Sequence, residues 1–437
     1  MIKHHRFDNG FQIVYQKSEQ LNPVTSMNVF CGVGSAFEVD PIRGASHFVE
    51  HMCFKGTREH MKARNLLMEY NKVGAQFNAY TTKRYTAYTI TCGDDHIKHC
   101  TDLLSDMLLF SEFPQKEFDK EQRVVVEENI RTKDNNEYML EKSLDALYFH
   151  GNSYQYPIDI IDYHPSPTHL RREDIYQWYK WFYRPSNMIY SIVSNLPFNK
   201  IVNCIKTSRF MKKETNSIAP TFLYPTLTIE PINQHFMYYQ KKGIAATILH
   251  VGFRTCNYHS KDKYIIQLLT HILNGFSGRL FTAFRTKRGL TYHSSAHTTY
   301  HEHTGYFNFF IQTDPAKLIN DGKNIGIIPI LIDMITNLIQ DGITPLELEV
   351  AKGNCKGKML IALQSIEKLV EYNGINSIMQ EDTVPFQHIY KKYIEPITVS
   401  QVNAIICKYM TSNNLVVGIA YDKDIPKRKI EEMFTVI

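Results

Sequence analysis

Two histidines separated by three residues are the feature of this sequence best suited to chemistry. They occur in the segment His47-Phe-Val-Glu-His51. On a helix, side chains four residues apart share a face, so both imidazoles can reach one metal ion. Glu50 follows His47 by three residues, beside such an ion rather than opposite it, where a carboxylate can take a proton from water. This spacing is the inverted form of a known zinc motif and predicts a zinc-dependent hydrolase.

A hydrolytic zinc site usually has three protein ligands, and two adjacent acids on a predicted helix are candidates for the third. Glu127 has an arginine four residues to either side, which is typical of a solvated ion-pair face. Glu128 shares its face with Val124, Val125 and Glu121, a partly apolar stripe expected to point inward. We therefore choose Glu128 as the ligand and keep Glu127 as the second choice. Glu121 is expected to hydrogen-bond a liganding histidine.

The elements that must position these residues follow from the periodicity of apolar side chains. The first half of the chain is predicted to contain strands at 11–15, 24–30 and 187–193, helices at 43–54, 62–73, 96–111 and 115–148, and a hairpin at 76–92. The second half repeats this order loosely, with strands at 246–253 and 415–421, helices at 261–274, 277–288, 318–340 and 345–375, and two strands within 291–313.

The repeated order predicts an α+β fold of two similar domains, each a mostly antiparallel sheet covered by helices. Residues 1–206 are assigned to a zinc-bearing peptidase domain and residues 238–437 to a second, homologous domain. Between them, residues 207–237 contain three prolines and lack sustained periodicity, which is typical of a linker.

Composition narrows the class of protein. The 437 residues are too many for one ordinary core, and 43% apolar with 21% charged residues is the balance of a globular protein. The net charge of +5 comes from scattered side chains rather than a basic stripe, which argues against nucleic acid as a partner. The eight cysteines include no CxxC pair, which argues against a cysteine zinc site and against a dense disulfide framework.

The sequence also bears on location. It contains no stretch of 18 uninterrupted apolar residues, so no membrane span is predicted, and the apolar segment 325–339 is interpreted as a buried helix. The N-terminal region lacks the apolar core of a signal peptide and does not resemble a transit peptide. A cytoplasmic protein is expected.

The sequence around the histidines resembles a known family. The run Gly44-Ala-Ser-His-Phe-Val-Glu-His-Met-Cys-Phe-Lys-Gly-Thr57 is similar to the signature of the insulinase-like, or M16, metallopeptidases. The similarity continues at Gly74–Thr81 and at Glu121–Glu128. In this family the third ligand falls seven residues after an acidic helper, as Glu128 follows Glu121, although members with one residue fewer would point to Glu127. The resemblance implies one Zn²⁺ per chain and hydrolysis of peptide bonds.

The second half carries a further part of the resemblance. The segment from Leu273 to Tyr292 is similar to a glycine-containing stretch and an arginine–tyrosine pair of the family, although Asn274 and Phe276 stand where relatives are often richer in glycine. Carried over, Arg285 and Tyr292 would hold the substrate carbonyl and stabilise the oxyanion. Without the resemblance they would be interpreted as a surface arginine and a strand tyrosine.

Substrate and assembly are further expectations. The hairpin after Gly74 offers Asn78, Ala79 and Tyr80 as an edge to which an extended peptide adds as a strand, a mode that reads main chain more than side chain. Family members of this length pair around a chamber, so we expect a homodimer, or a heterodimer with a related chain. The alternative function is a non-catalytic structural core subunit of a larger complex, since some relatives have lost the motif. The sequence leaves the substrate open.

Overall fold

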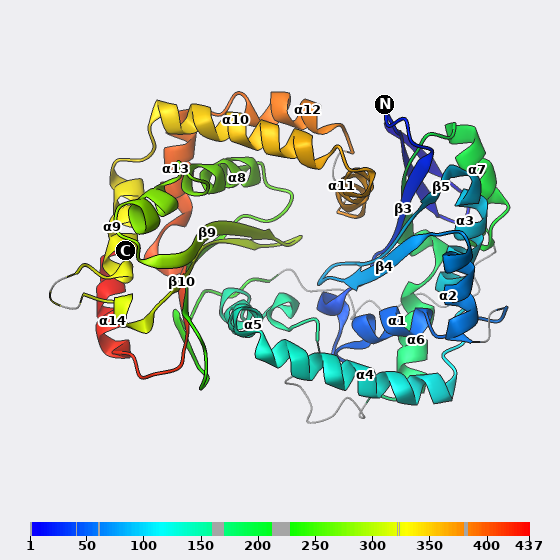
Figure 1. Ribbon diagram of the computed structural model, residues 1–437, viewed down its shortest axis with the longest axis horizontal. Coiled ribbons are helices and arrows are strands. Elements are labelled where there is room, and N and C mark those ends of the chain that lie inside the picture. Colours follow the sequence, from blue (N-terminus) through cyan, green and yellow to red (C-terminus); the bar gives the residue numbers. More distant parts are fainter. Residues whose placement is uncertain are drawn as a thin grey trace. The chain divides into compact units, whose positions relative to one another are not determined.

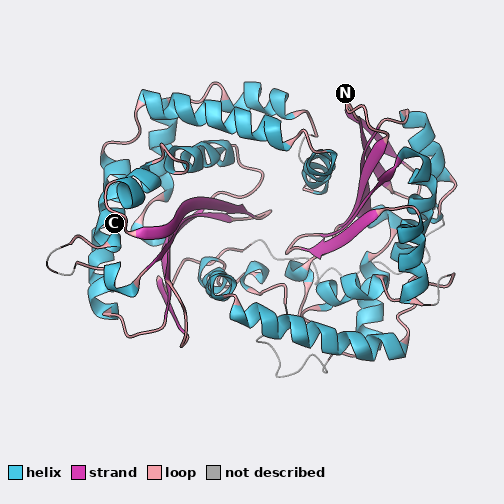
Figure 2. Cartoon of the chain, in the orientation of Figure 1, coloured by secondary structure: helices cyan, strands magenta, loops and turns pink. Residues whose placement is uncertain are grey.

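The computed structural model describes residues 2–40, 42–59, 62–159, 170–211, 228–320, 322, 324–379 and 383–437. The chain forms two compact units, each built from a sheet and helices (Figures 1 and 2). The first unit comprises Met1–Thr132, Tyr156–Thr226 and Ile361–Pro385. The second comprises Lys133–Gln155, Leu227–Leu360 and Phe386–Ile437.

The sheet of the first unit has, within the described residues, the strand order β1-β2-β6-β3-β5-β4. Neighbouring strands are antiparallel except for the parallel pair β2 and β6. The hairpin strand β4 lies at one edge of the sheet. The strands are β1 (Ile2–Arg6), β2 (Gln12–Lys17), β3 (Val24–Cys31), β4 (Gln76–Thr81), β5 (Thr86–Gly93) and β6 (Met188–Ser194).

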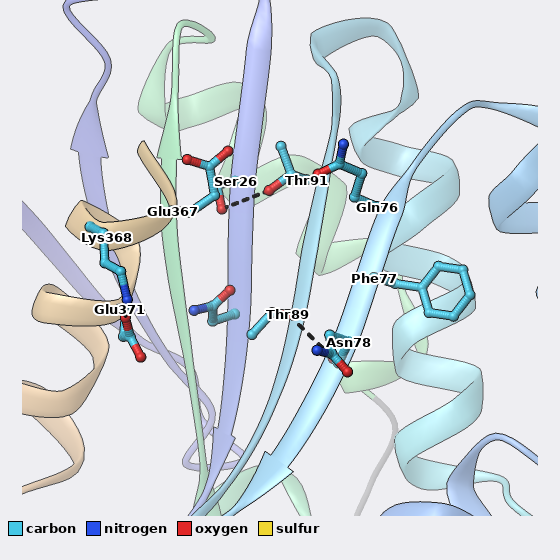
Figure 3. Close-up of a pocket in the computed structure, with 10 residues that line it drawn as sticks. Ser26, Gln76, Phe77, Asn78, Thr89, Thr91, Glu367, Lys368 and Glu371 are labelled. Carbon is cyan, nitrogen blue, oxygen red and sulfur yellow. Dashed lines mark hydrogen bonds and ion pairs between the residues drawn. The ribbon is translucent and has the colours of Figure 1, made fainter. Parts of the chain in front are cut away.

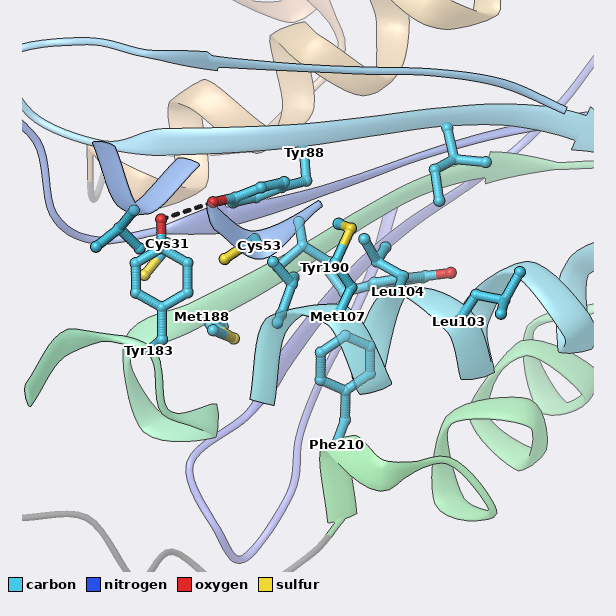
Figure 4. Packing of buried hydrophobic residues seen from close by; sticks show 14 of the residues in the cluster. Cys31, Cys53, Tyr88, Leu103, Leu104, Met107, Tyr183, Met188, Tyr190 and Phe210 are labelled. Carbon is cyan, nitrogen blue, oxygen red and sulfur yellow. Dashed lines mark hydrogen bonds between the residues drawn. The ribbon is translucent and has the colours of Figure 1, made fainter. Parts of the chain in front are cut away.

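Alternation along β3 gives this sheet two different faces. Met27 and Val29 point into the main apolar core, together with Tyr88 of β5 (Figure 4), whereas Ser26 and Asn28 point to the opposite face, because successive strand side chains alternate. Figure 4 also shows the hydroxyls of two buried tyrosines in this core meeting, at 2.8 Å. The helices of the first unit are α1 (Ala45–Cys53), α2 (Ala63–Lys72), α3 (Ile97–Leu109), most of α4 (Gln115–Asp134), α6 (Arg172–Phe182), α7 (Phe198–Lys206) and α11 (Ile366–Ile378).

The sheet of the second unit has the order β7-β11-β8-β10-β9 within the described residues. Its strands are β7 (Phe236–Gln240), β8 (Thr247–Thr255), β9 (Thr291–Tyr300), β10 (Gly305–Thr313) and β11 (Leu415–Tyr421). Its helices are α5 (Asn136–Tyr148), α8 (Asp262–Leu273), α9 (Ile327–Gln340), α10 (Pro345–Ala362), α12 (Phe386–Ile389), α13 (Val399–Tyr409) and α14 (Lys427–Met433). A short π-helix, η8 (Phe281–Thr286), precedes β9.

Apart from the additional edge strand β1 of the first sheet, the two sheets have the same topology within the described residues, which confirms the predicted pair of similar α+β domains. In each, a parallel pair of strands is followed by three antiparallel neighbours, and the last strand of the unit returns to lie inside the sheet. The edge strands β4 and β9 occupy equivalent places in this order. Each begins a hairpin whose second strand lies one position further into the sheet.

Four predicted helices have different limits in the structure. The helix predicted over 115–148 is two helices, because Asn135 ends α4 and its side chain caps α5 by accepting from the Tyr138 N–H at 3.1 Å. The helix predicted over 345–375 also breaks, at Ser365, whose hydroxyl accepts from the Lys368 N–H at 3.2 Å and caps α11. The helix predicted over 318–340 begins only at Ile327, and the one predicted over 277–288 is mainly the π-helix η8.

After each break, the following helix belongs to the compact unit formed mainly by the other half of the sequence. Helix α5 packs on β11 of the second unit, where Gly418 leaves room for Leu144. Helix α11 packs on β3 and β6 of the first unit (Figure 1). The predicted division into 1–206 and 238–437 keeps each segment in its own half of the sequence, whereas the compact units cross that division at these two places. Most of the predicted linker, residues 212–227, lies outside the described residues.

Two further expectations concern chemistry and location. All eight cysteines are free thiols in the structure. Within the described part of the chain, no single helix has the length and apolar composition needed to cross a membrane; the bent pair α9 and α10 passes that test only when the two helices are taken together.

Candidate metal centre

Helix α1 is held firmly at its N-terminus and along its back. Gly44 precedes the helix with a φ of 89°, a left-handed conformation that favours glycine. Glu38 accepts from the backbone N–H groups of Gly44 and Ser46 at 2.6 and 2.7 Å, which supplies the first turn with acceptors. Phe48 and Val49 are fully buried on the core side. The histidines of this helix therefore project from a fixed support.

The two histidines and one glutamate of the predicted motif converge. The Nε2 atoms of His47 and His51 lie 3.2 Å apart. Oε2 of Glu128 lies 3.3 Å from Nε2 of His51 and 4.0 Å from Nε2 of His47. Ligands about 2.1 Å from a tetrahedral ion are roughly 3.4 Å from one another. These two nitrogens and one carboxylate oxygen therefore have the spacing and the chemistry of a zinc ligand set, and they form the one such group found among the described residues.

Of the two adjacent acids on α4, the structure brings Glu128 to the histidines, whereas Glu127 points to solvent. Val125 and Glu121, on the same stripe as Glu128, are buried. Val124 was also expected on the inward stripe, but it is 39% exposed. The inward face is thus narrower than predicted and follows the spacing of 121, 125 and 128.

Glu121 links the second histidine to a lysine. Its Oε1 lies 2.8 Å from Nδ1 of His51, and its Oε2 lies 2.7 Å from Nζ of Lys55. Burial acts to raise the pKa of Glu121, but the bonds from His51 and Lys55 lower it, so the carboxyl is ionised. An ionised acceptor at Nδ1 keeps the proton there, so Nε2, which lies 3.3 Å from Glu128, is the nitrogen that can bind a metal.

The two imidazoles have opposite pKa shifts. Burial lowers the pKa of His47 to about 3, assisted by the neighbouring His51, so His47 is neutral as a metal ligand must be. Burial also acts to lower the pKa of His51, but the hydrogen bond to Glu121 and the charges of Glu128 and Glu50 raise it overall. The carboxylates around His51 therefore favour a positive charge at this site.

Glu50 lies beside the cluster and is held by a hydroxyl from the edge strand. Thr81, the last residue of β4, donates its Oγ1 hydrogen to Oε2 of Glu50 at 2.7 Å. Burial raises the pKa of Glu50, while this bond acts to lower it. A carboxylate with a raised pKa accepts a proton more readily than an ordinary one. Strand β4 and the acid of the motif are thus directly connected.

The three residues predicted to bind peptide lie on β4 at the free edge of the sheet. Thr82 donates its N–H to the Tyr85 carbonyl at 2.8 Å. Because hydrogen-bonded and non-bonded pairs alternate along an antiparallel ladder, Ala79 directs its N–H and C=O away from β5. That N–H is satisfied by Oδ1 of Asn78 at 2.9 Å. Tyr80 is half-buried, and its hydroxyl lies 3.3 Å from Glu371.

Arg285 and Tyr292 lie in the second unit, the former in η8 and the latter at the start of β9. Tyr292 is 70% exposed, which is unusual for a tyrosine on a strand. The Arg285 guanidinium lies 5.7 Å from the ring centre of Phe281. Both side chains are therefore accessible, and neither is committed to an ion pair among the described residues.

Three residues of the site were not singled out from the sequence. Lys55 follows His51 by four residues, and that spacing on one helix face was a usable signal. Thr81 ends the segment Gly74–Thr81 that resembles the family, and no local pattern gives its hydroxyl a role. Glu38 precedes the helix across a loop, and no local pattern indicates that its carboxylate turns back to the first turn.

The chain is similar to known proteins over most of its length. Residues 13–159 match the family model described as insulinase (peptidase family M16), and residues 169–355 match that of the peptidase M16 inactive domain. The chain is 28% identical to the uncharacterized zinc protease YmxG of Bacillus subtilis over 87% of this chain and 88% of the relative. The chain belongs to the M16 family of metallopeptidases.

Solved structures show the same fold. The crystal structure of a protease from Helicobacter pylori superposes with a TM-score of 0.86 at 21% identity, covering 96% of this chain and 99% of that one. A peptidase M16 inactive domain from Pseudomonas fluorescens superposes with a TM-score of 0.83 at 16% identity, covering 97% and 98%. The resemblance stated from the sequence is confirmed at the level of family and fold.

Proposed function

We propose that this chain is a zinc-dependent endopeptidase that cleaves extended peptides or unfolded segments. The observation that carries the proposal is the convergence of His47, His51 and Glu128 within 4.0 Å of one another, with Glu50 beside them. Two imidazoles and one carboxylate are the protein ligands of many hydrolytic zinc sites. We propose one Zn²⁺ per chain, since the described residues contain one such ligand group.

The three side chains fit the metal by their chemistry as well as by their spacing. His47 is neutral, Nε2 of His51 lies beside Glu128, and Glu128 supplies a carboxylate oxygen. Zinc in such a site acts as a Lewis acid that polarises a carbonyl and makes water more acidic. The other residues of the site then position these ligands and transfer the protons.

Glu50 is assigned the proton transfers. Its carboxylate is partly buried beside the cluster and is oriented by Thr81. As water attacks the peptide carbonyl, Glu50 accepts the proton of the water and later donates it to the leaving amine. The raised pKa suits both steps, because a group that binds its proton more firmly takes it more readily and still releases it to an amine.

The free edge of β4 is assigned to the main chain of the substrate. The outward N–H and C=O of Ala79 can pair with an extended peptide once the side chain of Asn78 releases that N–H. Thr81 lies two residues further along the same strand and contacts Glu50. A peptide bound in this register would lie beside the catalytic acid, and recognition through the main chain predicts broad sequence tolerance.

Arg285 and Tyr292 are proposed to hold the substrate carbonyl and to stabilise its developing negative charge. Their exposure supports this assignment, since both side chains are available to a ligand. We further propose that the chain pairs with a second copy or with a related chain and that the pair supplies these residues to the metal centre. A fully active monomer in analytical ultracentrifugation would overturn the shared-site part of the proposal.

The second candidate is a non-catalytic core subunit. It is favoured by one observation, the likeness of the fold to a protein described as an M16 inactive domain. A non-catalytic role would leave the converging ligands, and the Glu50 carboxylate that Thr81 orients, without a function. Retention of the complete motif therefore favours the peptidase.

The deciding experiment combines metal analysis with peptide hydrolysis. Purified protein is expected to contain about one zinc per chain, to lose cleavage of an unstructured peptide on chelation, and to regain it with added zinc. Glu128→Gln is expected to lose zinc, whereas Glu127→Gln, its neighbour on the solvent face, is expected to keep both zinc and activity. Zinc loading and turnover unaffected by Glu128→Gln would overturn the ligand assignment.

A further inference from the structure

Lys55 reaches the metal centre through Glu121. Its Nζ lies 2.7 Å from Oε2 of Glu121, while the other carboxylate oxygen lies 2.8 Å from Nδ1 of His51. Lys55 lies just after the end of helix α1, four residues beyond His51, whereas Glu121 belongs to α4. One carboxylate of α4 is therefore held on both of its oxygens by side chains from the segment that carries the histidines.

Burial makes the bond between Lys55 and Glu121 matter. The side chain of Glu121 is buried, and that of Lys55 is 25% exposed. An exposed ion pair contributes little because water screens it, whereas removal of one member of a buried pair leaves a charge without compensation. Apart from His51, Lys55 is the one basic side chain paired with Glu121 in the described part of the chain. Without the lysine, one oxygen of this carboxylate loses its partner, and the side chain is free to turn away from His51.

The main chain around Lys55 is fixed on both sides. Its N–H donates to the carbonyl of Met52 at 3.0 Å, which continues the last turn of α1. The next residue, Gly56, has a φ of 136°, in the region that favours glycine. The carbonyl of Gly56 accepts from the N–H of Glu112 at 3.2 Å. The lysine side chain therefore extends from a held backbone toward Glu121.

The contact at Glu121 bears on the position of Glu128. Helices α1 and α4 also pack through apolar side chains, with the ring centres of Phe48 and Phe118 4.8 Å apart. Apolar packing is not directional and tolerates small shifts of one helix along the other, whereas hydrogen bonds fix distance and angle. Glu128 follows Glu121 by two helical turns, about 10 Å along α4. The two bonds to Glu121 therefore set where the Glu128 carboxylate lies relative to the histidines.

A second lysine–glutamate pair of the first unit provides a contrast. Lys368 donates to Glu371 at 2.8 Å, and Figure 3 shows both side chains on helix α11. The two residues are three apart on that helix, and the lysine side chain is 63% exposed. This bond fixes no distance between two elements and is screened by water. Lys368 is therefore a matched control for Lys55.

We infer that Lys55 is a positioning residue of the metal centre, which holds Glu121 against His51 and thereby keeps α4, with Glu128, in register with the two histidines. The inference rests on the proposed zinc site. The charges of Lys55 and Glu121 offset each other, so the pair repels a nearby cation only weakly. The positional effect therefore decides the sign, and loss of Lys55 weakens metal binding.

The test measures zinc affinity by competition with a chromophoric chelator. Lys55→Met should bind zinc about tenfold more weakly than wild type, as is typical for loss of a group that orients a ligand from outside. Lys55→Arg should recover most of this loss, because a guanidinium can donate to the same carboxylate oxygen. Lys368→Met removes the same charge from the exposed pair and should leave the affinity unchanged.

A double variant shows whether Lys55 acts through Glu121. Lys55→Met combined with Glu121→Gln should bind zinc no more weakly than Glu121→Gln alone, because the route from the lysine to the ligand is already lost. The double variant also leaves no unpaired charge, so the comparison holds even where Lys55→Met alone does not fold. A further loss in the double variant, or an unchanged or higher affinity of Lys55→Met, overturns the inference.

The outcomes separate the positioning role from the peptidase. The predicted pattern of zinc affinities supports the role of Lys55 even if wild type cleaves no peptide, in which case only the proposed catalysis fails. If wild type binds no zinc, the proposed metal site fails, and hydrogen exchange of the metal-free proteins tests the position of α4. Exchange around Glu121 should then be faster in Lys55→Met than in wild type and Lys55→Arg, and equal rates overturn the inference.

Discussion

Nδ1 of His51 lies 2.8 Å from Oε1 of Glu121. The two residues belong to the two helices that build the metal centre. This bond joins α1 to α4 and fixes the imidazole that the motif directs to the metal. Glu121 is 4% exposed and also meets Lys55 at 2.7 Å. The ligand helix and the helix that carries Glu128 are thus connected at a point seven residues before Glu128.

Loss of the Glu121 charge should weaken metal binding without removing a ligand. Glu121→Gln is expected to reduce zinc affinity about tenfold, because a neutral amide holds the Nδ1 proton of His51 less firmly than a carboxylate does. Competition with a chromophoric chelator measures the change. Glu117→Gln, on the same helix and in an exposed pair with Lys120, serves as the control and should leave the affinity unchanged. Equal affinities for all three proteins would refute the role of Glu121.

Removal of the Thr81 hydroxyl should impair turnover rather than metal loading. Thr81→Val keeps the shape of the side chain but loses the 2.7 Å bond to Glu50, so kcat is expected to fall about tenfold while zinc content stays at the wild-type value. Thr207→Val, at an exposed position after α7, should have no effect. An unchanged kcat in Thr81→Val would show that Glu50 needs no support from the edge strand.

Packing of α11 on the first sheet gives a prediction about stability. A Cβ at Gly374 would lie 2.0 Å from the buried ring of Phe30, so Gly374→Ala should destabilise the first unit by about 1–3 kcal/mol. At Gly353, on the exposed side of α10, an added Cβ meets nothing within 4 Å, and alanine there should stabilise the helix by about 0.5–1 kcal/mol. Thermal unfolding, with hydrogen exchange to locate the change, would distinguish the two variants. Similar shifts in both variants would contradict this account of the packing.

The ion pair of Glu347 with Arg279 in the second unit makes the free energy of unfolding depend on pH. Arg279 donates to both oxygens of Glu347 at 2.6 and 2.8 Å. Burial acts to raise the pKa of Glu347, but these bonds, with those from Thr344, lower it below the ordinary value of about 4.5. The unfolded chain therefore binds the proton more tightly, and the stabilisation is present above about pH 4.5 and is lost as the pH falls through the folded pKa.

Glu347→Gln reveals this contribution. The variant should be less stable than wild type by about 1–2 kcal/mol at pH 7, and the difference should shrink below about pH 4.5 as wild type is protonated. Urea unfolding at a series of pH values measures it, with Glu349→Gln of the same helix as the exposed control. A difference that grows toward low pH would show that the sign is wrong.

The sequence predicted most of the site because its residues lie on two helices whose periodicity is local. His47, Glu50 and His51 share one helix, and the phase of α4 favours Glu128 over Glu127, although the spacing of the family leaves Glu127 open as a second choice. The contact between Thr81 and Glu50 was not predictable in this way, since it requires the end of β4 to meet α1.

The exchange of helices between the units was beyond the sequence for a similar reason. The breaks at Asn135 and Ser365 are made by single polar caps rather than by proline, so helical periodicity extends the predicted helices through them. Even with the breaks known, an apolar stripe on α11 indicates that a helix packs on something without naming the partner. The place of α11 on the first sheet depends on contacts between residues far apart in the sequence, such as the hydrogen bond from Asn373 to Gln16 of β2.

The most direct test of the central claim is the zinc content and peptide hydrolysis of Glu50→Gln beside wild type. The account predicts about one zinc per chain in both proteins, because Glu50 is not a ligand, with turnover reduced about 1000-fold in the variant, because the proton of the attacking water has lost its acceptor. Cleavage at the wild-type rate by a zinc-loaded Glu50→Gln protein would contradict the account.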